Sequence, residues 1–279
     1  MSVYKQLSDR IAAPEILVAP GVYDAFSAWR AQSLGFEAVF LSGSAVAMMH
    51  LGRPDIGLLT LPEMAEITGR VADRVDIPIF VDADQGFGNA AMAARTMQML
   101  ERAGAAGIQM EDQQSAKPSR AMLSRPLVST EEMVDKIKAA LDVRNNAGLM
   151  LSARCDAAAQ EGVEAALDRA AAYAAAGADM IFVENLTRKT EMTMLVDRIG
   201  LQKPLLHNLL RTGEEVQDAA TLQQMGYSVA LFPGIIPSAV GVGIDSALAA
   251  LAVQSKVANN NPSTDRINSA DYLNSFRTD

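Results

Sequence analysis

The sequence predicts a (β/α)₈ barrel, an α/β fold of TIM type in which parallel strands alternate with helices. Short apolar runs bounded by turn residues alternate strictly with longer amphipathic segments along the 279 residues. The short runs are nearly continuously apolar, which is typical of parallel strands buried on both faces. Eight such units fit the length of one barrel domain.

Each expected element follows from its own pattern. The apolar runs predict strands at 16–20, 38–42, 78–83, 106–111, 149–154, 180–184, 204–209 and 228–232. The segments with helical periodicity predict helices at 24–34, 62–75, 90–103, 130–145, 162–175, 188–199, 214–225 and 236–258.

Glycine marks the end of several of these helices. Gly35, Gly104, Gly177 and Gly226 each follow a helical pattern and lead into the next strand. Glycine adopts the left-handed conformation of a helix C-cap without the strain that a Cβ atom would cause. The same helix-to-strand turn is therefore expected at all four positions.

An open, doubly wound sheet is the alternative fold. The first strand is not followed by a Gly-rich dinucleotide fingerprint, which disfavours that alternative. We expect the barrel to occupy residues 1–258 and a polar tail to occupy 259–279. The tail contains either one short helix around 269–276 or a loosely ordered terminus.

Composition restricts the class of protein. Hydrophobic residues make up 49% of the chain and charged residues 20%, as in ordinary globular domains. The net charge of −9 disfavours nucleic acid and anionic membranes as partners. A single cysteine, Cys155, excludes an intrachain disulfide and a multi-cysteine metal site. The amino-terminal segment lacks a signal-peptide pattern, and no apolar run is expected to reach the length of a membrane span, so a cytoplasmic location is predicted.

Polar residues gather where the predicted strands end. Active sites of such barrels lie at the carboxyl ends of the strands. The polar residues found there are Ser42, Gly43, Ser44, Asp82, Asp84, Glu111, Asp112, Arg154, Asp156, Glu184, Asn185, His207, Asn208 and Arg211. Charged residues that follow apolar strands directly are expected to face the barrel mouth and to carry the chemistry.

Three carboxylates in this set predict a metal site. Asp82 and Asp84 are two residues apart on a strand, so both should leave it on one face, and Glu111 ends the next strand. Their mutual repulsion is relieved by a hard divalent cation, and Mg²⁺, or Mn²⁺ in its place, fits oxygen ligands. The alternative is that these acids cap turns and pair with Arg154 and Lys117. Zinc is disfavoured because histidine and cysteine are scarce.

The other strand ends predict an anion site. The backbone amides of Ser42, Gly43 and Ser44 could bind a carboxylate, and Arg154 offers a fork of donors to a carboxylate or to developing charge. The alternative role of Arg154, a salt bridge with Glu111 or Glu184, is compatible with the catalytic one. The connection 113–128 is long and basic, with Lys117, Ser119, Arg120 and Arg125, and is interpreted as a lid or as a plain solvated loop.

A set of motifs occurs in order across residues 14–250. The motifs are Pro20-Gly21-Val22-Tyr23-Asp24-Ala25, Ser42-Gly43-Ser44, Gly52-Arg53-Pro54-Asp55, Asp82-Ala83-Asp84-Gln85-Gly86-Phe87-Gly88-Asn89, Glu111-Asp112-Gln113, Ala153-Arg154-Cys155-Asp156-Ala157 and Ala176-Gly177-Ala178-Asp179. Together they resemble the isocitrate lyase and phosphoenolpyruvate mutase superfamily.

The resemblance implies a particular use of these residues. Mg²⁺ would be held, mostly through waters, by Asp55, Asp82, Asp84 and Glu111, and the reaction would pass through a pyruvate-type enolate. The resemblance implies substrate binding by the amides of Ser42, Gly43 and Ser44 and by Arg154. Together with the strand-end and lid positions, the predicted substrate-binding residues are Ser42, Gly43, Ser44, Asp84, Arg154, Glu184 and Asn208, and the predicted catalytic residues are Arg154, Lys117, Ser119 and Glu111. The resemblance also implies an eighth helix swapped between subunits and a homotetramer built as a dimer of dimers.

Two departures leave the substrate open. Lyases of this superfamily carry Lys-Arg-Cys-Gly-His or a close variant in the lid, where this chain has Lys117-Pro118-Ser119-Arg120-Ala121. The acidic thiol is therefore missing, and a serine hydroxyl is a poor general acid. Gln85 stands where the decarboxylases usually carry histidine and the cysteine-bearing lyases carry threonine.

The resemblance and the site together predict a Mg²⁺-dependent carbon–carbon lyase or decarboxylase. Its substrate would be a small anionic 2-oxo or 2-hydroxy dicarboxylate, either oxaloacetate or a substituted malate. One alternative is hydrolysis or rearrangement of the P–C bond of phosphonopyruvate. The other is a noncatalytic metal-binding relative.

Overall fold

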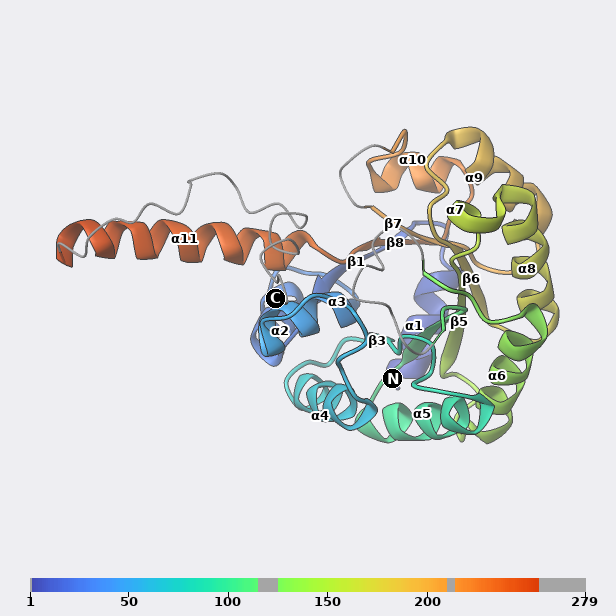
Figure 1. Cartoon of the computed structure of the whole chain (residues 1–279), viewed down its shortest axis with the longest axis horizontal. Helices are drawn as coiled ribbons and strands as arrows, with labels where there is room; N and C mark the ends of the chain where they lie inside the picture. The colour runs from blue at the N-terminus through green and yellow to red at the C-terminus, as the bar shows by residue number, and fades with distance from the viewer. Residues whose placement is uncertain (1, 115–124, 210–213, 256–279) are drawn as a thin grey trace.

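The computed structural model describes residues 2–114, 125–209 and 214–255. Its strands form one parallel sheet in the order β6-β5-β4-β3-β2-β1-β8-β7, and a parallel bridge between Ile181 and Leu205 joins the two edges into a nearly closed barrel. The helices surround this barrel (Figure 1). The predicted (β/α)₈ fold is confirmed, and the open doubly wound sheet is excluded.

The strands agree with the predicted ones to within two residues. Their bounds are β1 Leu17–Val22, β2 Val39–Leu41, β3 Ile79–Asp82, β4 Gly107–Glu111, β5 Met150–Cys155, β6 Met180–Val183, β7 Leu206–Asn208 and β8 Val229–Phe232.

The helices are α1 Val3–Ala12, α2 Ala25–Ser33, α3 Gly43–Val46, α4 Leu61–Ala72, α5 Ala90–Ala103, α6 Thr130–Val143, α7 Ala158–Glu161, α8 Val163–Ala175, α9 Lys189–Leu195, α10 Ala219–Gln224 and α11 Ile235–Ser255. Two π-helical segments, η1 Ala47–Leu51 and η2 Val196–Gly200, extend α3 and α9. The four predicted glycine turns are confirmed, since Gly35, Gly104, Gly177 and Gly226 all have φ between 87° and 109°.

Strand side chains alternate between two apolar clusters. One cluster lies between the barrel and the surrounding helices, and it includes Val39, Val81, Ile108 and Leu151. The other fills the barrel interior, with Leu17, Ala19, Phe40, Phe80, Phe182 and Leu231 among its members. This division follows from the two-residue period of a strand, which turns every second side chain toward the barrel axis.

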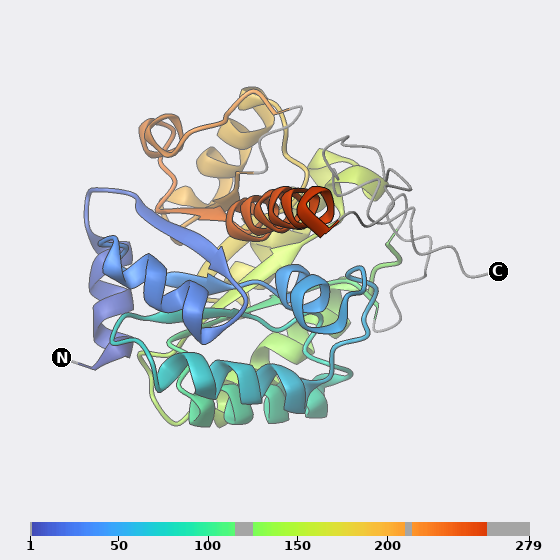
Figure 2. The ribbon, with the colours of Figure 1, turned by 90° about the vertical axis from the view of Figure 1, so that its left-hand side faces the viewer.

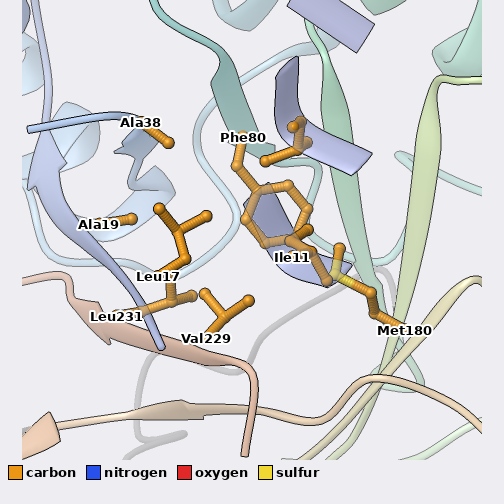
Figure 3. A pocket seen from close by; sticks show the side chains of 9 residues that line it. Ile11, Leu17, Ala19, Ala38, Phe80, Met180, Val229 and Leu231 are labelled. Atoms are coloured by element: carbon orange, nitrogen blue, oxygen red, sulfur yellow. The ribbon is translucent and has the colours of Figure 1, made fainter. Parts of the chain in front are cut away.

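The helix α1 closes the amino-terminal end of the barrel, and the sequence patterns did not predict it. Leu7 and Ile11, one helical turn apart, are buried in the interior cluster. Figure 3 shows Ile11 facing Leu17, Phe80 and Met180 across a small gap. The gap has a volume of only about 10 Å³, so this end of the barrel is packed core. In Figure 2, α1 lies at one end of the barrel and α3 at the other.

The last described helix, α11, projects away from the barrel (Figure 1). Its apolar side chains are exposed, as Val242, Leu248 and Leu251 illustrate. Residues 235–253 have a mean hydropathy of 1.7 over 19 residues, of which 6% are buried. By length and composition this helix could cross a membrane, so the expectation that no run reaches that length is wrong. A single such helix is weak evidence for a membrane span.

Candidate active site

A polar cavity of about 190 Å³ lies at the carboxyl ends of the strands. Its lining residues are Phe40, Ser42, Ser44, Asp55, Asp82, Glu111, Arg125, Arg154, Glu184, Asn208 and Pro233. The sequence places polar side chains two positions beyond the apolar interior layer, as in the pairs Phe80 and Asp82 or Phe182 and Glu184. Because strand side chains repeat every two residues, these polar groups also face the barrel axis. The cavity therefore brings together most of the predicted site residues.

Arg154 is at the centre of an ion-pair network in this cavity. Its Nε and Nη2 atoms donate to the two carboxylate oxygens of Asp156 at 2.9 and 2.7 Å. The guanidinium also approaches Glu184 at 3.3 Å and Glu111 at 3.5 Å. The predicted salt bridges of Arg154 with Glu111 and Glu184 are thus confirmed.

This network controls the ionisation of its members. Burial alone would lower the pKa of Arg154, but Asp156, Glu184 and Glu111 outweigh it and raise that pKa well above its usual value. Burial raises the pKa of Glu184, and the nearby Arg154 opposes that rise. The guanidinium also lies 5.4 Å from the centre of the Phe182 ring, which gives it a flat apolar support. Arg154 is therefore a fixed cation with a defined orientation.

The first carboxylate of the predicted metal set, Asp82, is at the end of β3 and lines the cavity. Its Oδ2 atom accepts from the Gly43 amide at 3.2 Å, and its Oδ1 atom accepts from the Asp84 amide at 3.2 Å. A Cβ atom at position 43 would lie 3.1 Å from Oδ2, so glycine permits this close approach. The Gly43 amide, predicted to bind a substrate carboxylate, donates to Asp82 here.

The second predicted carboxylate, Asp84, is placed differently. The strand ends at Asp82, and Asp84 is buried with a φ of 46°, in the left-handed region. The strand alternation invoked for Asp82 and Asp84 is therefore wrong, because the chain leaves the extended conformation between them. Asp84 is not among the lining residues of the cavity. Its role as a metal or substrate ligand stays a prediction.

Ser42 and Ser44 both line the cavity, but in a context that the strand pattern did not predict. Ser42 is the N-cap of the short helix α3, and its Oγ accepts from the Ala45 amide at 3.3 Å. The two serine hydroxyls lie 3.1 Å apart. On the opposite side, Asn208 donates from Nδ2 to Glu184 at 3.3 Å. These hydroxyl and amide groups add neutral hydrogen-bonding partners to the charged centre.

The donor set of the cavity fits a hard divalent cation. Four carboxylates (Asp55, Asp82, Glu111 and Glu184) face two arginines, which leaves an excess of negative charge. The carboxylates offer oxygen atoms as ligands, and Mg²⁺ prefers oxygen ligands. Within residues 2–114, 125–209 and 214–255, however, no three His, Cys, Asp or Glu side chains converge closely enough to hold an ion directly. Ligation partly through water, which Mg²⁺ favours, suits this arrangement.

The connection that follows β4 is described only at its two ends. Lys117, Ser119 and Arg120 lie outside the described residues, and so does Arg211. The Gln114 amide donates to the Pro126 carbonyl at 2.8 Å, and the Val128 amide donates to the Asp112 carbonyl at 2.9 Å. The ends of the connection are therefore paired, and this pairing brings Arg125 to the cavity.

A buried cluster behind Arg154 corrects the expectation that Asp112 faces the barrel mouth, since Asp112 packs against α8 and does not line the cavity. Asp112 is fully buried and accepts from the Tyr173 hydroxyl at 2.7 Å and from the Asp156 amide at 2.8 Å. Arg169 lies 3.5 Å from the same carboxylate. Burial raises the pKa of Asp112, and the hydrogen bonds from Asp156 and Tyr173 oppose that rise. The signal available in the sequence was the acidic pair Glu111-Asp112, whose two members face opposite sides of the strand.

Comparisons with known proteins agree with this geometry. The family model described as phosphoenolpyruvate phosphomutase matches residues 7–247. The chain is 38% identical to 2,3-dimethylmalate lyase of Eubacterium barkeri over 243 residues, which cover 84% of this chain and 80% of the relative.

Solved structures show the same similarity. Oxaloacetate acetylhydrolase in complex with 3,3-difluorooxalacetate superposes with a TM-score of 0.84 and 27% identity, covering 98% of this chain and 92% of that one. Phosphonopyruvate hydrolase in complex with oxalate and Mg²⁺ gives a TM-score of 0.82 and 25% identity, covering 96% and 94%.

Proposed function

The chain belongs to the phosphoenolpyruvate phosphomutase family, within the superfamily shared with isocitrate lyases, and from this premise we propose that it is a Mg²⁺-dependent carbon–carbon lyase or decarboxylase. Its relatives are lyases, and it is an enzyme of this kind. The proposed substrate is a 2-oxo or 2-hydroxy dicarboxylate, either oxaloacetate or a substituted malate.

The observation that carries the proposal is the composition of the cavity. Arg154 presents a fixed guanidinium beside Glu111 and Glu184, in a space of about 190 Å³ that suits a small dicarboxylate. A divalent cation held by Asp55, Asp82, Asp84 and Glu111, mostly through water, would supply positive charge to the substrate carboxylate and to the oxygen that gains charge as the bond breaks.

The protein groups perform the remaining tasks. Arg154 orients the substrate and stabilises developing negative charge through donors that are already in place. Ser42, Ser44 and Asn208 provide hydrogen bonds to neutral oxygen atoms of the substrate. Lys117, Ser119 and Glu111 complete the proposed catalytic set, in which Ser119 occupies the position of the thiol acid of related lyases. A weak acid at that position favours decarboxylation, because loss of CO₂ leaves an enolate that water can protonate.

Cleavage of a P–C bond is the second candidate. It is favoured by the similarity to phosphonopyruvate hydrolase over nearly the whole chain and by the missing thiol. A phosphonate carries more negative charge than a carboxylate, so this reaction would require Arg125 and the basic residues Lys117 and Arg120 to face the substrate together. A noncatalytic metal-binding role is set aside because the relatives are enzymes.

The test is pyruvate release from a panel of oxaloacetate, 2,3-dimethylmalate, methylisocitrate and phosphonopyruvate, with Mg²⁺, with Mn²⁺ and with chelator. We expect metal-dependent turnover of oxaloacetate or of a substituted malate. Turnover of phosphonopyruvate alone would replace the proposal with the second candidate. Turnover that is unchanged by chelator would refute the metal requirement.

Ser119 separates the two forms of the proposed reaction. If the enzyme is a decarboxylase, Ser119→Ala should retain most activity on oxaloacetate. Ser119→Cys should raise any weak activity on methylisocitrate, because it restores a thiol acid at that position. Loss of all turnover in Ser119→Ala, with unchanged folding, would contradict the decarboxylase hypothesis and indicate serine-dependent bond cleavage.

We further propose that the enzyme is cytoplasmic and forms a homotetramer of two dimers, in which α11 is exchanged between paired subunits. The exposed apolar surface of α11 and its projection from the barrel support the exchange (Figure 1). Packing against another subunit would remove that apolar surface from water. The burial of apolar surface is the main source of the free energy of association.

A further inference from the structure

The side chain of Gln113 connects two parts of the cavity that are far apart in the sequence. Its Nε2 atom donates to Asp156 Oδ1 at 3.0 Å, and its Oε1 atom accepts from Arg125 Nη1 at 3.3 Å. Gln113 is only 1% exposed, so water does not compete for these bonds. A carboxamide is both a donor and an acceptor, and it can therefore bridge a carboxylate and a guanidinium at once.

The acid at one end of this bridge fixes the catalytic arginine. Asp156 binds Arg154 through both carboxylate oxygens, and its own amide donates to Asp112 at 2.8 Å. Gln113 donates to the same oxygen that accepts from Arg154 Nη2. A change in the position of the Gln113 amide would therefore reach the guanidinium of Arg154 through one carboxylate.

The arginine at the other end lies at the edge of the cavity. Arg125 lines the cavity, and its Nη2 atom is 3.9 Å from Asp55 Oδ2. Its backbone carbonyl accepts from the side-chain amide of Gln160, and the antiparallel bridge between Gln113 and Leu127 holds the neighbouring chain. The two arginines that line the cavity are thus joined by the path Arg125, Gln113, Asp156 and Arg154.

We propose that Gln113 is a positioning residue that couples Arg125 to Arg154, so that the two guanidinium groups bind the anionic groups of one substrate as a unit. The inference rests on the proposed function only in that the substrate is a small dicarboxylate. The proposal gives Arg125 a role in substrate recognition, because this residue presents a second cation at the edge of the cavity. Without the bridge, each arginine would bind an anion independently.

The test compares two neighbouring glutamines. Gln113→Met removes both hydrogen bonds with little change in side-chain volume. Gln114→Met is the matched control, because the exposed Gln114 side chain donates to the Leu127 carbonyl at 3.2 Å and does not bridge charged groups. Oxalate binding to the full chain in the presence of Mg²⁺ is measured by calorimetry, and folding is monitored by thermal unfolding.

We expect Gln113→Met to weaken oxalate binding by about tenfold or more, because it removes two buried hydrogen bonds to charged groups that hold the two arginines. Gln114→Met should change it by less than about twofold. Arg125→Met should weaken binding in the wild-type background but add little in the Gln113→Met background, because coupled residues are not additive. Arg125→Met and Gln114→Met should be additive.

Equal effects of the two methionine variants, or additive effects of Arg125→Met and Gln113→Met, would overturn the proposal. A crystal structure of Gln113→Met with unchanged Asp156 and Arg154 side chains would do the same, whether or not oxalate binds. Gln113→Asn, which is too short to reach both partners, serves if the methionine variant does not fold. Oxalate binding requires no turnover, so failure of the substrate panel would refute the proposed function and leave this test intact.

Discussion

The hydroxyl group of Tyr173 offers a sharp test of the buried cluster behind Arg154. Tyr173 is fully buried, and its hydroxyl donates to Asp112 at 2.7 Å. Tyr173→Phe keeps the ring and its packing and removes only this donor. Asp112 then retains the Asp156 amide and Arg169, the latter 3.5 Å away, as partners for its carboxylate.

The expected cost follows from the charge of the acceptor. A hydrogen bond to a charged group contributes about 1.5–3 kcal/mol, and a buried acceptor that loses its donor cannot turn to water instead. For a domain of this size, each kcal/mol of unfolding free energy corresponds to about 2–4 °C in Tm. Tyr173→Phe should therefore lower Tm by about 3–12 °C.

Tyr227→Phe is the matched control. Tyr227 is also buried, but its hydroxyl donates to a neutral acceptor, the Met192 carbonyl, at 3.5 Å. Its loss should cost less than about 1 kcal/mol. Thermal unfolding of both variants at pH 7 gives the comparison, and kcat/KM should fall only in Tyr173→Phe because Asp112 also holds the Asp156 amide. Equal Tm shifts in the two variants would refute the assignment of a strong charged hydrogen bond.

The remaining predictions concern catalysis, pH and assembly. Arg154→Lys should lower kcat by about 10²-fold with a smaller change in KM, because an ammonium group does not replace the planar fork; an unchanged kcat in steady-state assays would reject that role. Hydrogen bonds from the Thr60 hydroxyl and amide lower the pKa of Glu63 from 4.5. The ionised carboxylate therefore stabilises the folded state above pH 4.5, and this stabilisation is lost as the pH falls through the lowered pKa. The Tm advantage of the wild type over Glu63→Gln should accordingly be present at pH 7 and vanish in acid; a difference that grows in acid would contradict it. Leu248→Glu, at a residue 58% exposed on α11, should reduce the mass measured by light scattering, and an unchanged mass would argue against assembly through α11.

The barrel could be predicted because its signals are local. Each strand is a short apolar run, and glycines such as Gly104 and Gly177 end helices in a conformation that their lack of a side chain permits. The helix α1 was not predicted, although Val3, Tyr4, Leu7 and Ile11 have helical spacing and pack on the interior cluster. It precedes the first strand and so lies outside the strand-helix alternation on which the prediction was based.

The candidate site was predictable only up to the strand ends. Asp82, Glu111 and Arg154 follow apolar strands directly, and strand geometry carries them into the cavity. Asp84 breaks this rule because its backbone turns into the left-handed region, a local conformation that the strand pattern does not encode. The bridge through Gln113 depends on contacts between side chains of separate segments, which no periodicity in the sequence reveals.

The packed end of the barrel under α1 has a consequence for the order of events in catalysis. With Leu7 and Ile11 filling that end, the described residues leave the cavity no exit through the amino-terminal end of the barrel, so products leave toward the carboxyl ends of the strands. If one substrate is split into two products there, the fragment nearer the carboxyl ends must leave before the deeper one can follow. Product release should then be sequential, so that product-inhibition experiments show one product competing with the substrate and the other acting noncompetitively. Competitive inhibition by both products would instead indicate release in random order.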